Sequence, residues 1–436
     1  MHLTVLKKGM IAMTTSLRCF LTLAILALTA GSGFAADFPP GWLPVNRLDE
    51  KPTWEEFRKI EDKIHVYLPK DVKTVRGVFA CFVFHSQDPR QLADLWEFAL
   101  VTVPWPFEYD LGHNDKRNGR FKLGHPVGDM GTFLRYLEEA AKETKHPELT
   151  TVPIVGWLMQ NGPKLGGDLF KRAPERVLAW SDGFPKPVSE AAEMTAKVPF
   201  AYAWEFTPAE EKERRALREA KLDTLKDKPT TPPNFSCRAN TYGFGHGIYS
   251  KFSFFAFYLD RCIAQRLPKE LPEPGKPVVL KPWKKEDGWA GDYNEISNWN
   301  AIAPVKEAKG MVDPQWLPDE YAAWAWRSYH THRPELQMTA PVVDFRKAAE
   351  RKVKDCGLGY SPPIKPGTPL KFAAEGTGEF AKVEFYTGNR LLGISDKAPW
   401  KLDEVKLDRG LHALFAVGVK TDGARTSSRP ALLMVK

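Results

Sequence analysis

Between residues 78 and 265 the sequence alternates short apolar runs with segments of helical periodicity, and this alternation constrains the fold more than any other feature. The apolar runs lie at 78–84, 99–103, 152–155, 177–180 and 198–204. Helical spacing of apolar side chains is found at 131–145 and again at 251–265. Continuous apolar runs separated by helices are typical of parallel strands that are buried on both faces. The sequence therefore predicts an α/β domain over residues 37–270, with a mostly parallel sheet and flanking helices.

The first 36 residues have the three parts of a secretory signal peptide. Lys7 and Lys8 are followed by an apolar stretch of about a dozen residues, and small residues then continue to Ala36. This stretch is shorter than the roughly 20 apolar residues of a membrane-spanning helix, and no later run is long enough to span a bilayer. We therefore expect a mature protein that is exported, periplasmic or extracellular, and that has no transmembrane segment.

The formal net charge of +8 does not indicate a nucleic-acid partner. The predicted signal peptide contains three basic residues and no acidic residue, so its removal lowers the charge from +8 to +5. Spread over roughly 400 residues, this excess forms no Lys/Arg-rich block of the kind that follows a phosphate backbone. We therefore expect no nucleic acid among the partners.

The composition changes at two Pro-rich boundaries, near residues 271 and 361. Beyond the second boundary, strand-like runs recur at 370–374, 382–386, 391–394, 411–419 and 431–435, with turn sequences between them. This spacing predicts a small all-β sandwich over residues 361–436. Through Val383-Glu-Phe-Tyr386, Ala398-Pro-Trp400 and Gly410-Leu-His412, the region resembles the bacterial immunoglobulin-like domains of exported proteins. The resemblance implies a spacer or accessory module, in which His412 is expected to be structural.

The segment 271–360 lies between the two domains and is rich in proline and tryptophan. Six of the fourteen tryptophans of the chain fall between residues 283 and 326. Such side chains can clamp the faces of carbohydrate rings, or they can anchor an irregular segment on a neighbouring domain. We favour packing, in which this extension covers part of the α/β domain. The sequence at 316–327 predicts a capped helix within it.

Several segments between residues 72 and 268 together match one known fold. Phe84-His-Ser-Gln87 follows the first apolar run, 151–156 ends in a glycine, and Tyr242-Gly-Phe-Gly-His-Gly247 precedes the last helix. Together these segments resemble the α/β-hydrolase fold of exported bacterial esterases and peptidases. The resemblance implies that 78–84 and 99–105 are the third and fourth strands of that fold. It also implies that the nucleophile elbow follows 151–156.

The same resemblance implies a catalytic histidine and an acid that orients it. His246, between Gly245 and Gly247, is the candidate general base. The acid would follow the run 198–204, which makes Glu205 the candidate and Glu210 a weaker one. Together they would form the His–acid half of a Ser-His-acid triad.

The nucleophile of such a triad is missing from the elbow. Alignment on Gly156 places Leu158 at the nucleophile position, and counting back from the end of the following helix places Gln160 there. Neither side chain can attack a carbonyl group, so no acyl-enzyme can form at this position. Ser86 and Ser181 lie at other strand ends and could act as displaced nucleophiles. Whether the chain is an enzyme is therefore open, and a relic site that binds a ligand is the favoured interpretation.

No cofactor and no metal site is expected. His85, His113 and His125 lack the helical spacing of a zinc-binding pair, and they have no Cys-x-x-Cys partner. The Gly- and Asp-rich loop 107–129, which contains two of these histidines, is expected to overhang the pocket instead, since long loops inside compact domains tend to be functional.

Four cysteines follow the predicted signal peptide. Cys81 lies inside an apolar run and is expected to be a small core residue. An even number of cysteines in an oxidising compartment permits disulfides, and Cys237 with Cys262 is the best candidate pair.

These features predict an exported α/β-hydrolase-like protein whose catalytic machinery has degenerated. Its partner would be a small-molecule, carbohydrate or envelope ligand, such as a polysaccharide. One alternative is an active ester hydrolase that acts on acylated carbohydrates or small esters with a displaced serine nucleophile. A second alternative is a non-catalytic surface or adhesive protein, in which the extension and the sandwich are the working parts.

Overall fold

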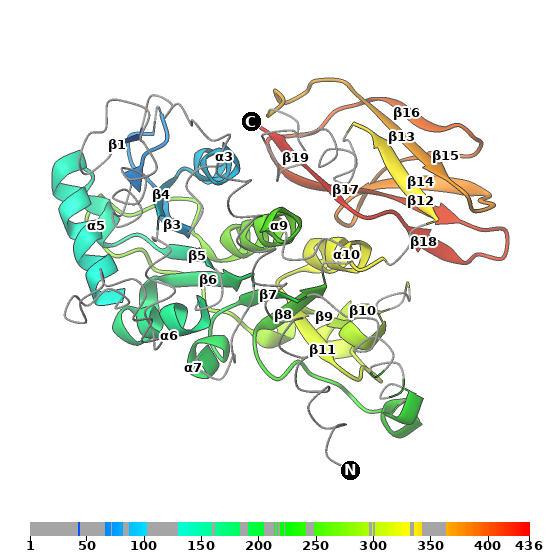
Figure 1. Cartoon of the computed structure of the whole chain (residues 1–436), viewed down its shortest axis with the longest axis horizontal. Coiled ribbons are helices and arrows are strands. Elements are labelled where there is room, and N and C mark those ends of the chain that lie inside the picture. The colour runs from blue at the N-terminus through cyan, green and yellow to red at the C-terminus, as the bar shows by residue number, and fades with distance from the viewer. Residues whose placement is uncertain are drawn as a thin grey trace, which may run out of the picture.

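The computed structural model of the chain describes residues 42–43, 66–70, 72–81, 87–102, 130–158, 162–183, 191–204, 213, 216, 219–221, 223–240, 248–295, 299, 301–331, 335–341 and 363–436. These residues form an α/β part, a Trp-rich extension and an antiparallel β-sandwich (Figure 1). No helix among them is long and apolar enough to cross a membrane.

The α/β part is built on an eight-stranded sheet with the order β1-β2-β4-β3-β5-β6-β7-β8. Every pair from β4-β3 to β7-β8 is parallel, whereas β1 and β2 run antiparallel to their neighbours. The strands are β1 Trp42–Leu43, β2 Val66–Tyr67, β3 Gly77–Cys81, β4 Phe98–Thr102, β5 Ile154–Leu158, β6 Val177–Asp182, β7 Phe200–Trp204 and β8 Ser236–Asn240. The predicted α/β class with a mostly parallel sheet is confirmed.

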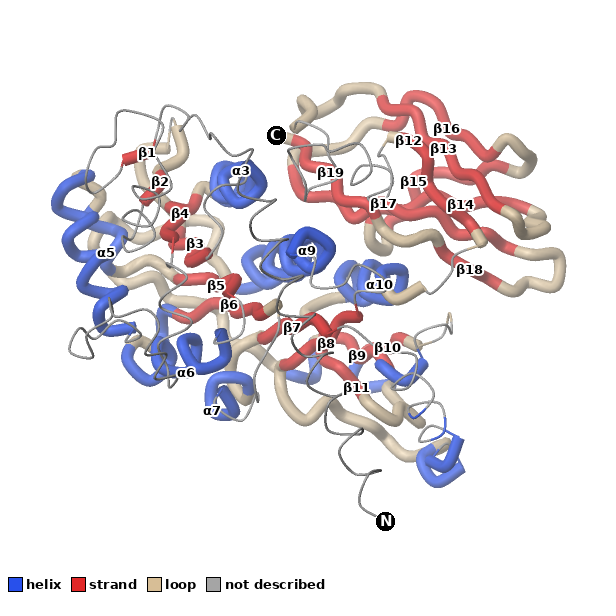
Figure 2. The backbone as a smooth tube through the Cα atoms, in the orientation of Figure 1, coloured by secondary structure: helices blue, strands red, loops and turns tan. Residues whose placement is uncertain are grey.

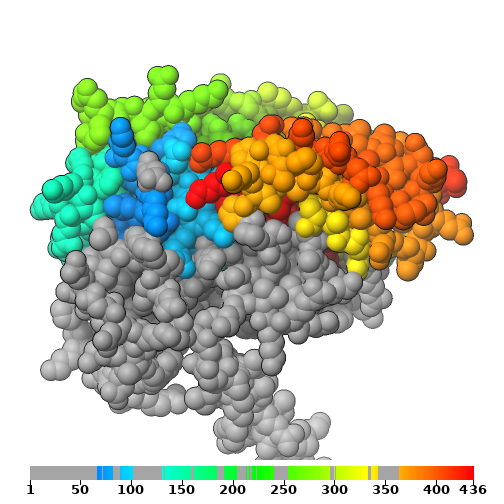
Figure 3. All heavy atoms as spheres, turned by 90° about the horizontal axis from the view of Figure 1, so that it is seen from above, coloured from blue at the N-terminus to red at the C-terminus, as the bar shows by residue number. Residues whose placement is uncertain are grey.

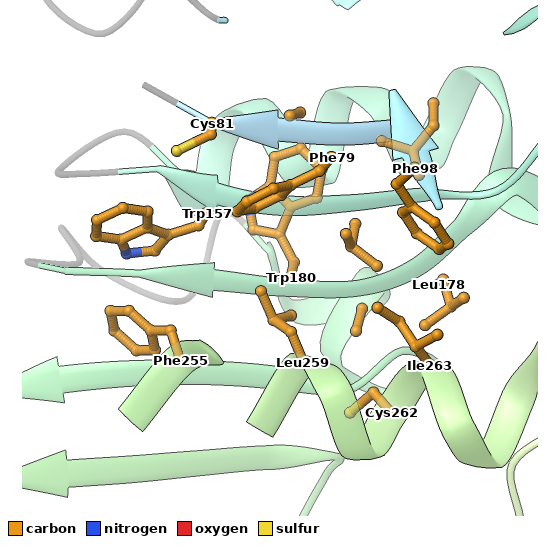
Figure 4. Close-up of a cluster of buried hydrophobic side chains, with 14 of the residues drawn as sticks. Phe79, Cys81, Phe98, Trp157, Leu178, Trp180, Phe255, Leu259, Cys262 and Ile263 are labelled. Carbon is orange, nitrogen blue, oxygen red and sulfur yellow. The ribbon is translucent and has the colours of Figure 1, made fainter. Parts of the chain in front are cut away.

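Helices cover both faces of this sheet (Figures 1 and 2). One face carries α3 (Gln87–Trp96) and α9 (Ile248–Arg266), and the other carries α5 (Met130–Thr144), α6 (Gly162–Arg172) and α7 (Ala192–Thr195). Phe255, Leu259 and Ile263 follow one another at intervals of four residues along α9 and point toward the sheet (Figure 4). This buried stripe fixes α9 on the sheet.

Each of the five apolar runs overlaps one of the strands β3 to β7, as the sequence predicts. The edge strand β8 is not predicted, because its apolar side chains are few. Cys237 and Ala239 are fully buried, but they alternate with the polar residues Ser236, Arg238 and Asn240. The two inward residues are too small to produce an apolar run.

The Trp-rich extension packs against β8. Its strands β9 (Trp289–Asp292), β10 (Ile302–Pro304) and β11 (Pro314–Leu317) form a small antiparallel sheet, and helix α10 (Glu320–Tyr329) follows. Asp319 caps α10 by accepting a hydrogen bond from the backbone N–H of Ala322 at 2.8 Å. Trp316 and Trp326 are fully buried, and Nε1 of Trp326 donates to the carbonyl oxygen of Arg238 at 2.7 Å. These two tryptophans thus lie in the interior of the protein.

The β-sandwich consists of two antiparallel sheets. One has the order β12-β13-β16, and the other has the order β15-β14-β17-β18 with β19 paired to β17. The strands are β12 Leu336–Ala340, β13 Leu370–Gly376, β14 Lys382–Thr387, β15 Arg390–Ser395, β16 Trp400–Val405, β17 Gly410–Val419, β18 Arg425–Ser427 and β19 Ala431–Val435. The predicted small all-β region is present.

One strand of the sandwich comes from the segment that the sequence assigns to the extension. β12 pairs with β13, and its Leu336 and Met338 enter the sandwich core. The sandwich therefore begins before the predicted boundary at residue 361. A five-residue strand with two inward apolar side chains is too short to show a period in the sequence.

The sandwich docks on the α/β part. Leu411 of β17 and Met434 of β19 are buried in the same core cluster as α9. At the rim of this contact, Nζ of Lys436 lies 2.6 Å from the carboxylate of Asp94 in α3. In the space-filling view, red atoms of the C-terminal strands lie beside the blue atoms of the α3 segment (Figure 3). The sandwich therefore shares a continuous core with the α/β part and is not a tethered spacer.

The predicted disulfide between Cys237 and Cys262 is not formed. Both residues are buried free thiols. Cys237 lies in β8 and Cys262 on α9, and both side chains fill the apolar core. Burial raises the pKa of both thiols well above the ordinary value, which keeps them protonated and unreactive. The core position predicted for Cys81 is confirmed.

Asp260 of α9 makes stability depend on pH. Burial raises the pKa of its carboxyl from 3.8 to about 6, although Nε1 of Trp96 donates a hydrogen bond to it at 2.9 Å. Because the folded pKa lies above the unfolded one, folding favours the protonated carboxyl. Stability is therefore expected to fall by on the order of 1–2 kcal/mol as the pH rises from about 4 through about 6.

The substitution Asp260→Asn tests this expectation, since an amide keeps an acceptor for Trp96 and cannot ionise. Urea unfolding between about pH 4 and pH 7 should show a flatter stability profile for the variant than for the wild type. Asp227→Asn, at an exposed position, is the matched control and should keep the wild-type profile. Identical profiles for Asp260→Asn and the wild type would contradict the assignment.

Candidate functional site

Six parallel strands end at one edge of the main sheet, and the candidate site lies there. Their last residues are Cys81, Thr102, Leu158, Asp182, Trp204 and Asn240. From β3 the chain continues to β4 on one side, whereas from β5 it continues to β6 on the other side. In open α/β sheets, ligands bind outside the carboxyl ends of the strands at such a switch point. The carboxyl ends of β3 and β5 are therefore the expected centre of the site.

The predicted catalytic residues follow strands that are neighbours at this edge. Glu205 comes directly after β7, and His246 lies between β8 and α9. Gln160 lies between β5 and α6. These three residues, and Glu210, are outside the described residues. What the structure brings together is the set of strand ends that carry them, because β5, β6, β7 and β8 are consecutive in the sheet.

The connection from β5 to α6 is short and contains no nucleophile. It consists of Met159, Gln160 and Asn161. Leu158, one of the two predicted nucleophile positions, is the last residue of β5, and its fully buried side chain belongs to the core. Gln160 stands two residues after Leu158 and two before Gly162, at the centre of the G-x-S-x-G spacing of a nucleophile elbow.

The start of α6 lies tightly against β6. A Cβ atom at Gly162 would overlap the carboxylate of Asp182, so a larger residue does not fit there without rearrangement. Nε1 of Trp180 donates to the carbonyl oxygen of Gly162 at 2.9 Å, and a Cβ atom at Gly156 would overlap the ring of Trp180. Such a close approach at a strand–helix turn is what a nucleophile elbow requires.

Asp182 is a polar residue of this edge that the sequence does not single out. It ends β6 and is fully buried, and its carboxylate lies beside the first residue of α6, where the helix dipole favours a negative charge. It pairs in register with Leu158 of β5 and Tyr202 of β7. It thus stands between the strands that lead to Gln160 and Glu205. An acidic residue directly after a buried apolar run is the signal that could have identified it.

Ser181 is not a displaced nucleophile. It is fully buried, and its Oγ donates to the carbonyl oxygen of Gly156 at 3.0 Å. The other candidate, Ser86, lies outside the described residues. So do the histidines considered as metal ligands, which are His85, His113 and His125. In the described part of the chain, no three His, Cys, Asp or Glu side chains are placed to hold a metal ion.

His412 of the sandwich has the structural role that the sequence predicts. Its Nδ1 lies 3.2 Å from the hydroxyl oxygen of Thr387, and its Nε2 lies 2.9 Å from the carbonyl oxygen of Asp408. Burial lowers the pKa of the imidazole and keeps it neutral. Both ring nitrogens thus serve hydrogen bonds within the sandwich.

No known family model matches the chain, and no curated protein matches it. Fibronectin(III)-like modules of Clostridium thermocellum CbhA are 23% identical, with a TM-score of 0.18, over 23% of this chain and 45% of theirs. A predicted CIB-like hydrolase from Thermoplasma acidophilum is 14% identical, with a TM-score of 0.23, over 43% of this chain and 85% of that one. A β-glucuronidase from Parabacteroides merdae is 9% identical, with a TM-score of 0.16, over 70% of this chain and 47% of that one. With such low TM-scores, these likenesses establish neither a family nor an activity for this chain.

Proposed function

We propose that this chain is an exported α/β-hydrolase-like protein that has lost its nucleophile and binds an envelope or polysaccharide-type ligand at the carboxyl edge of its parallel sheet. One observation carries the proposal. The bounds of β5 and α6 leave Met159, Gln160 and Asn161 between them, and none of the three is Ser, Cys or Asp. An elbow without such a side chain cannot form an acyl-enzyme.

The order of the strands supports the hydrolase-like part of the proposal. The resemblance expects the third strand at 78–84, the fourth at 99–105 and the elbow strand at 151–156. The structure has β3, β4 and β5 in these segments. The acid and the histidine are expected after later strands, and Glu205 and His246 follow β7 and β8.

The polar groups that remain suit binding better than turnover. An imidazole from His246 and a carboxylate from Glu205 would hydrogen-bond the hydroxyl groups of a saccharide. Loss of the nucleophile from a triad leaves an acceleration of only about 10³–10⁴ over the reaction in water. Residual hydrolysis at this level would be far slower than that of an enzyme with a complete triad.

An ester assay tests the loss of catalysis. The wild-type protein is expected to hydrolyse chromogenic short-chain esters far more slowly than a serine esterase, at a rate that an active-serine inhibitor does not change. Turnover that is well above this rate and is abolished by an active-serine inhibitor would overturn the proposal. It would favour the alternative of an active ester hydrolase with a displaced nucleophile, for which Ser86 would be the first residue to substitute.

Restoring the nucleophile tests the relic site directly. If Gln160 occupies the elbow and His246 is retained as a base, Gln160→Ser should hydrolyse the same esters measurably, and a second substitution, His246→Ala, should abolish that activity. Asn161→Ser adds the same hydroxyl one position away and is the matched control, expected to stay inactive. Equal activity in Gln160→Ser and Asn161→Ser would show that the elbow is not centred on Gln160.

Retention on insoluble peptidoglycan, chitin and cellulose tests the ligand class. Binding at the carboxyl edge predicts that His246→Ala weakens retention of the full chain on one of these materials. Retention that is unchanged in this variant would instead favour the surface or adhesive alternative. Point substitutions are preferable to removal of 280–436, because that deletion would expose the core that Leu411 and Met434 share with α9.

A further inference from the structure

Two arginines share one indole ring where α10 meets the sandwich. Arg327, in α10, is 6% exposed, and its Cζ lies 3.4 Å from the ring centroid of Trp299 and 4.5 Å from that of Trp324. Arg425, in β18, places its Cζ 4.6 Å from the Trp299 centroid. Tyr386 of β14 adds a further ring, with its centroid 5.1 Å from that of Trp324. We call these five residues the seam cluster.

The positive charge of the seam cluster is only partly compensated. Glu384 is the acidic side chain that contacts it, and this carboxylate bonds to Arg425, to Nζ of Lys382 at 2.8 Å and to the hydroxyl of Tyr386 at 2.7 Å. Among the described residues, Arg327 has no carboxylate partner. Burial and the nearby charge of Arg425 lower the pKa of Arg327 to about 9. A buried guanidinium whose charge is stabilised mainly by indole rings is a strong attractor for an anion.

One nitrogen of the Arg327 guanidinium donates a hydrogen bond, and two others have no acceptor among the described residues. Nη1 donates to the carbonyl oxygen of Trp299 at 2.7 Å. Nε and Nη2 are buried and have no hydrogen-bond partner in the described part of the chain, and the same holds for Nε of Arg425. Nε and Nη2 form one edge of the guanidinium plane, and this edge matches two oxygens of a carboxylate, sulfate or phosphate group.

We propose that the seam cluster is an oxyanion site, in which Nε and Nη2 of Arg327 bind two oxygens of one acidic group and Arg425 supplies a second positive charge. The ligand is a free sulfate or phosphate ion, or the acidic group of a saccharide whose ring contacts Trp299 or Trp324. This site uses α10 and the sandwich, and it therefore goes beyond the function proposed for the carboxyl edge of the main sheet.

Thermal unfolding of the full chain in the presence of defined anions tests the proposal. Sodium sulfate, sodium phosphate and sodium glucuronate are titrated against sodium chloride of equal ionic strength, with glucose as the neutral sugar. A bound oxyanion is expected to raise the Tm by about 3 °C or more, with a saturable dependence on concentration. Sulfate also stabilises proteins generally, but that effect does not saturate and does not depend on one arginine.

The variant Arg327→Lys keeps a positive charge but loses the two-pronged edge, and it is expected to abolish the saturable rise. Arg390→Lys, at a position where the side chain is 51% exposed, is the matched control and should keep it. If Arg327→Lys does not fold, Arg425→Gln should weaken the same rise, since the Arg425 side chain is 29% exposed and tolerates change better.

Each outcome decides one point. A rise with sulfate or phosphate alone identifies a free-ion site, and a rise with glucuronate alone identifies an acidic saccharide as the ligand. A rise with both supports the shared oxyanion chemistry. No saturable rise with any of the three anions, or an equal rise in wild type and Arg327→Lys, would overturn the proposal.

Discussion

Replacing Trp180 with Ala is expected to lower the free energy of unfolding by about 3–5 kcal/mol. Trp180 is fully buried in β6, and its ring lies where Gly156 and Gly166 have no Cβ atom. Its Nε1 donates to the carbonyl oxygen of Gly162 at the start of α6. Alanine would leave a cavity between β5, β6 and α6 and an unpaired carbonyl group. Urea unfolding followed by circular dichroism measures the change.

Two further variants separate the contributions of Trp180. Trp180→Phe keeps most of the ring volume but removes the indole donor, so a smaller loss of about 1–3 kcal/mol is expected. Val279→Ala, at a position where the side chain is 83% exposed, is the surface control and should change stability by less than about 0.5 kcal/mol. A loss below about 1 kcal/mol in Trp180→Ala would contradict the tight packing described for the elbow junction.

Tyr321→Phe is expected to lower the free energy of unfolding by about 1–3 kcal/mol and to loosen the sandwich from the rest of the chain. The Tyr321 hydroxyl accepts a hydrogen bond from the backbone N–H of Ala413 at 2.8 Å and donates one to the carbonyl oxygen of Leu411 at 3.3 Å. Its ring lies 5.0 Å from the guanidinium of Arg261 on α9. Burial raises the pKa of the phenol, which keeps it a neutral donor. Phenylalanine would leave the N–H of Ala413 buried without an acceptor.

Calorimetry distinguishes loosening from a uniform loss of stability. The wild type is expected to unfold in one transition, because the sandwich and the α/β part share a core. In Tyr321→Phe, an earlier transition from the sandwich should separate from the main one. Tyr136→Phe, on the half-buried α5 position, is the matched control and should leave a single transition. An unchanged profile in Tyr321→Phe would mean that apolar contacts such as those of Leu411 and Met434 hold the sandwich without this hydroxyl.

In the main sheet, the strands that the sequence predicts correctly are those whose burial is visible in their own residues. β3 to β7 are covered by helices on both faces, so nearly every side chain in them is apolar. β8 and β12 are strands as well, but each is stabilised by contacts with a segment that lies elsewhere in the chain. Tyr293 and Asp313 of the Trp-rich extension contact the Arg238 side chain of β8, and β13 pairs with β12. A pattern within five residues cannot record a partner that lies elsewhere in the chain.

In the candidate site, too, some residues can be predicted from the sequence and one cannot. Gln160 and Glu205 are inferred from their positions after apolar runs, and His246 from its position before the last helix. The strands β5, β7 and β8 that precede them belong to the consecutive series β5-β6-β7-β8 of the sheet. Asp182 is not inferred, because an acidic residue after a run is usually an exposed loop residue. Its burial beside the first residue of α6 follows from how closely α6 approaches β6.

The amino-acid sequence by itself determined the class of the main sheet and the absence of Ser, Cys and Asp from positions 159–161. Both depend on which residues are present, since buried strands require apolar runs and covalent catalysis requires a particular side chain. Only the tertiary structure decided that β5 ends at Leu158 and α6 begins at Gly162, that the sandwich shares a core with α9, and that Arg327 and Arg425 meet at Trp299. These features arise from contacts between segments far apart in the chain, where packing and hydrogen bonding select partners that no local pattern encodes.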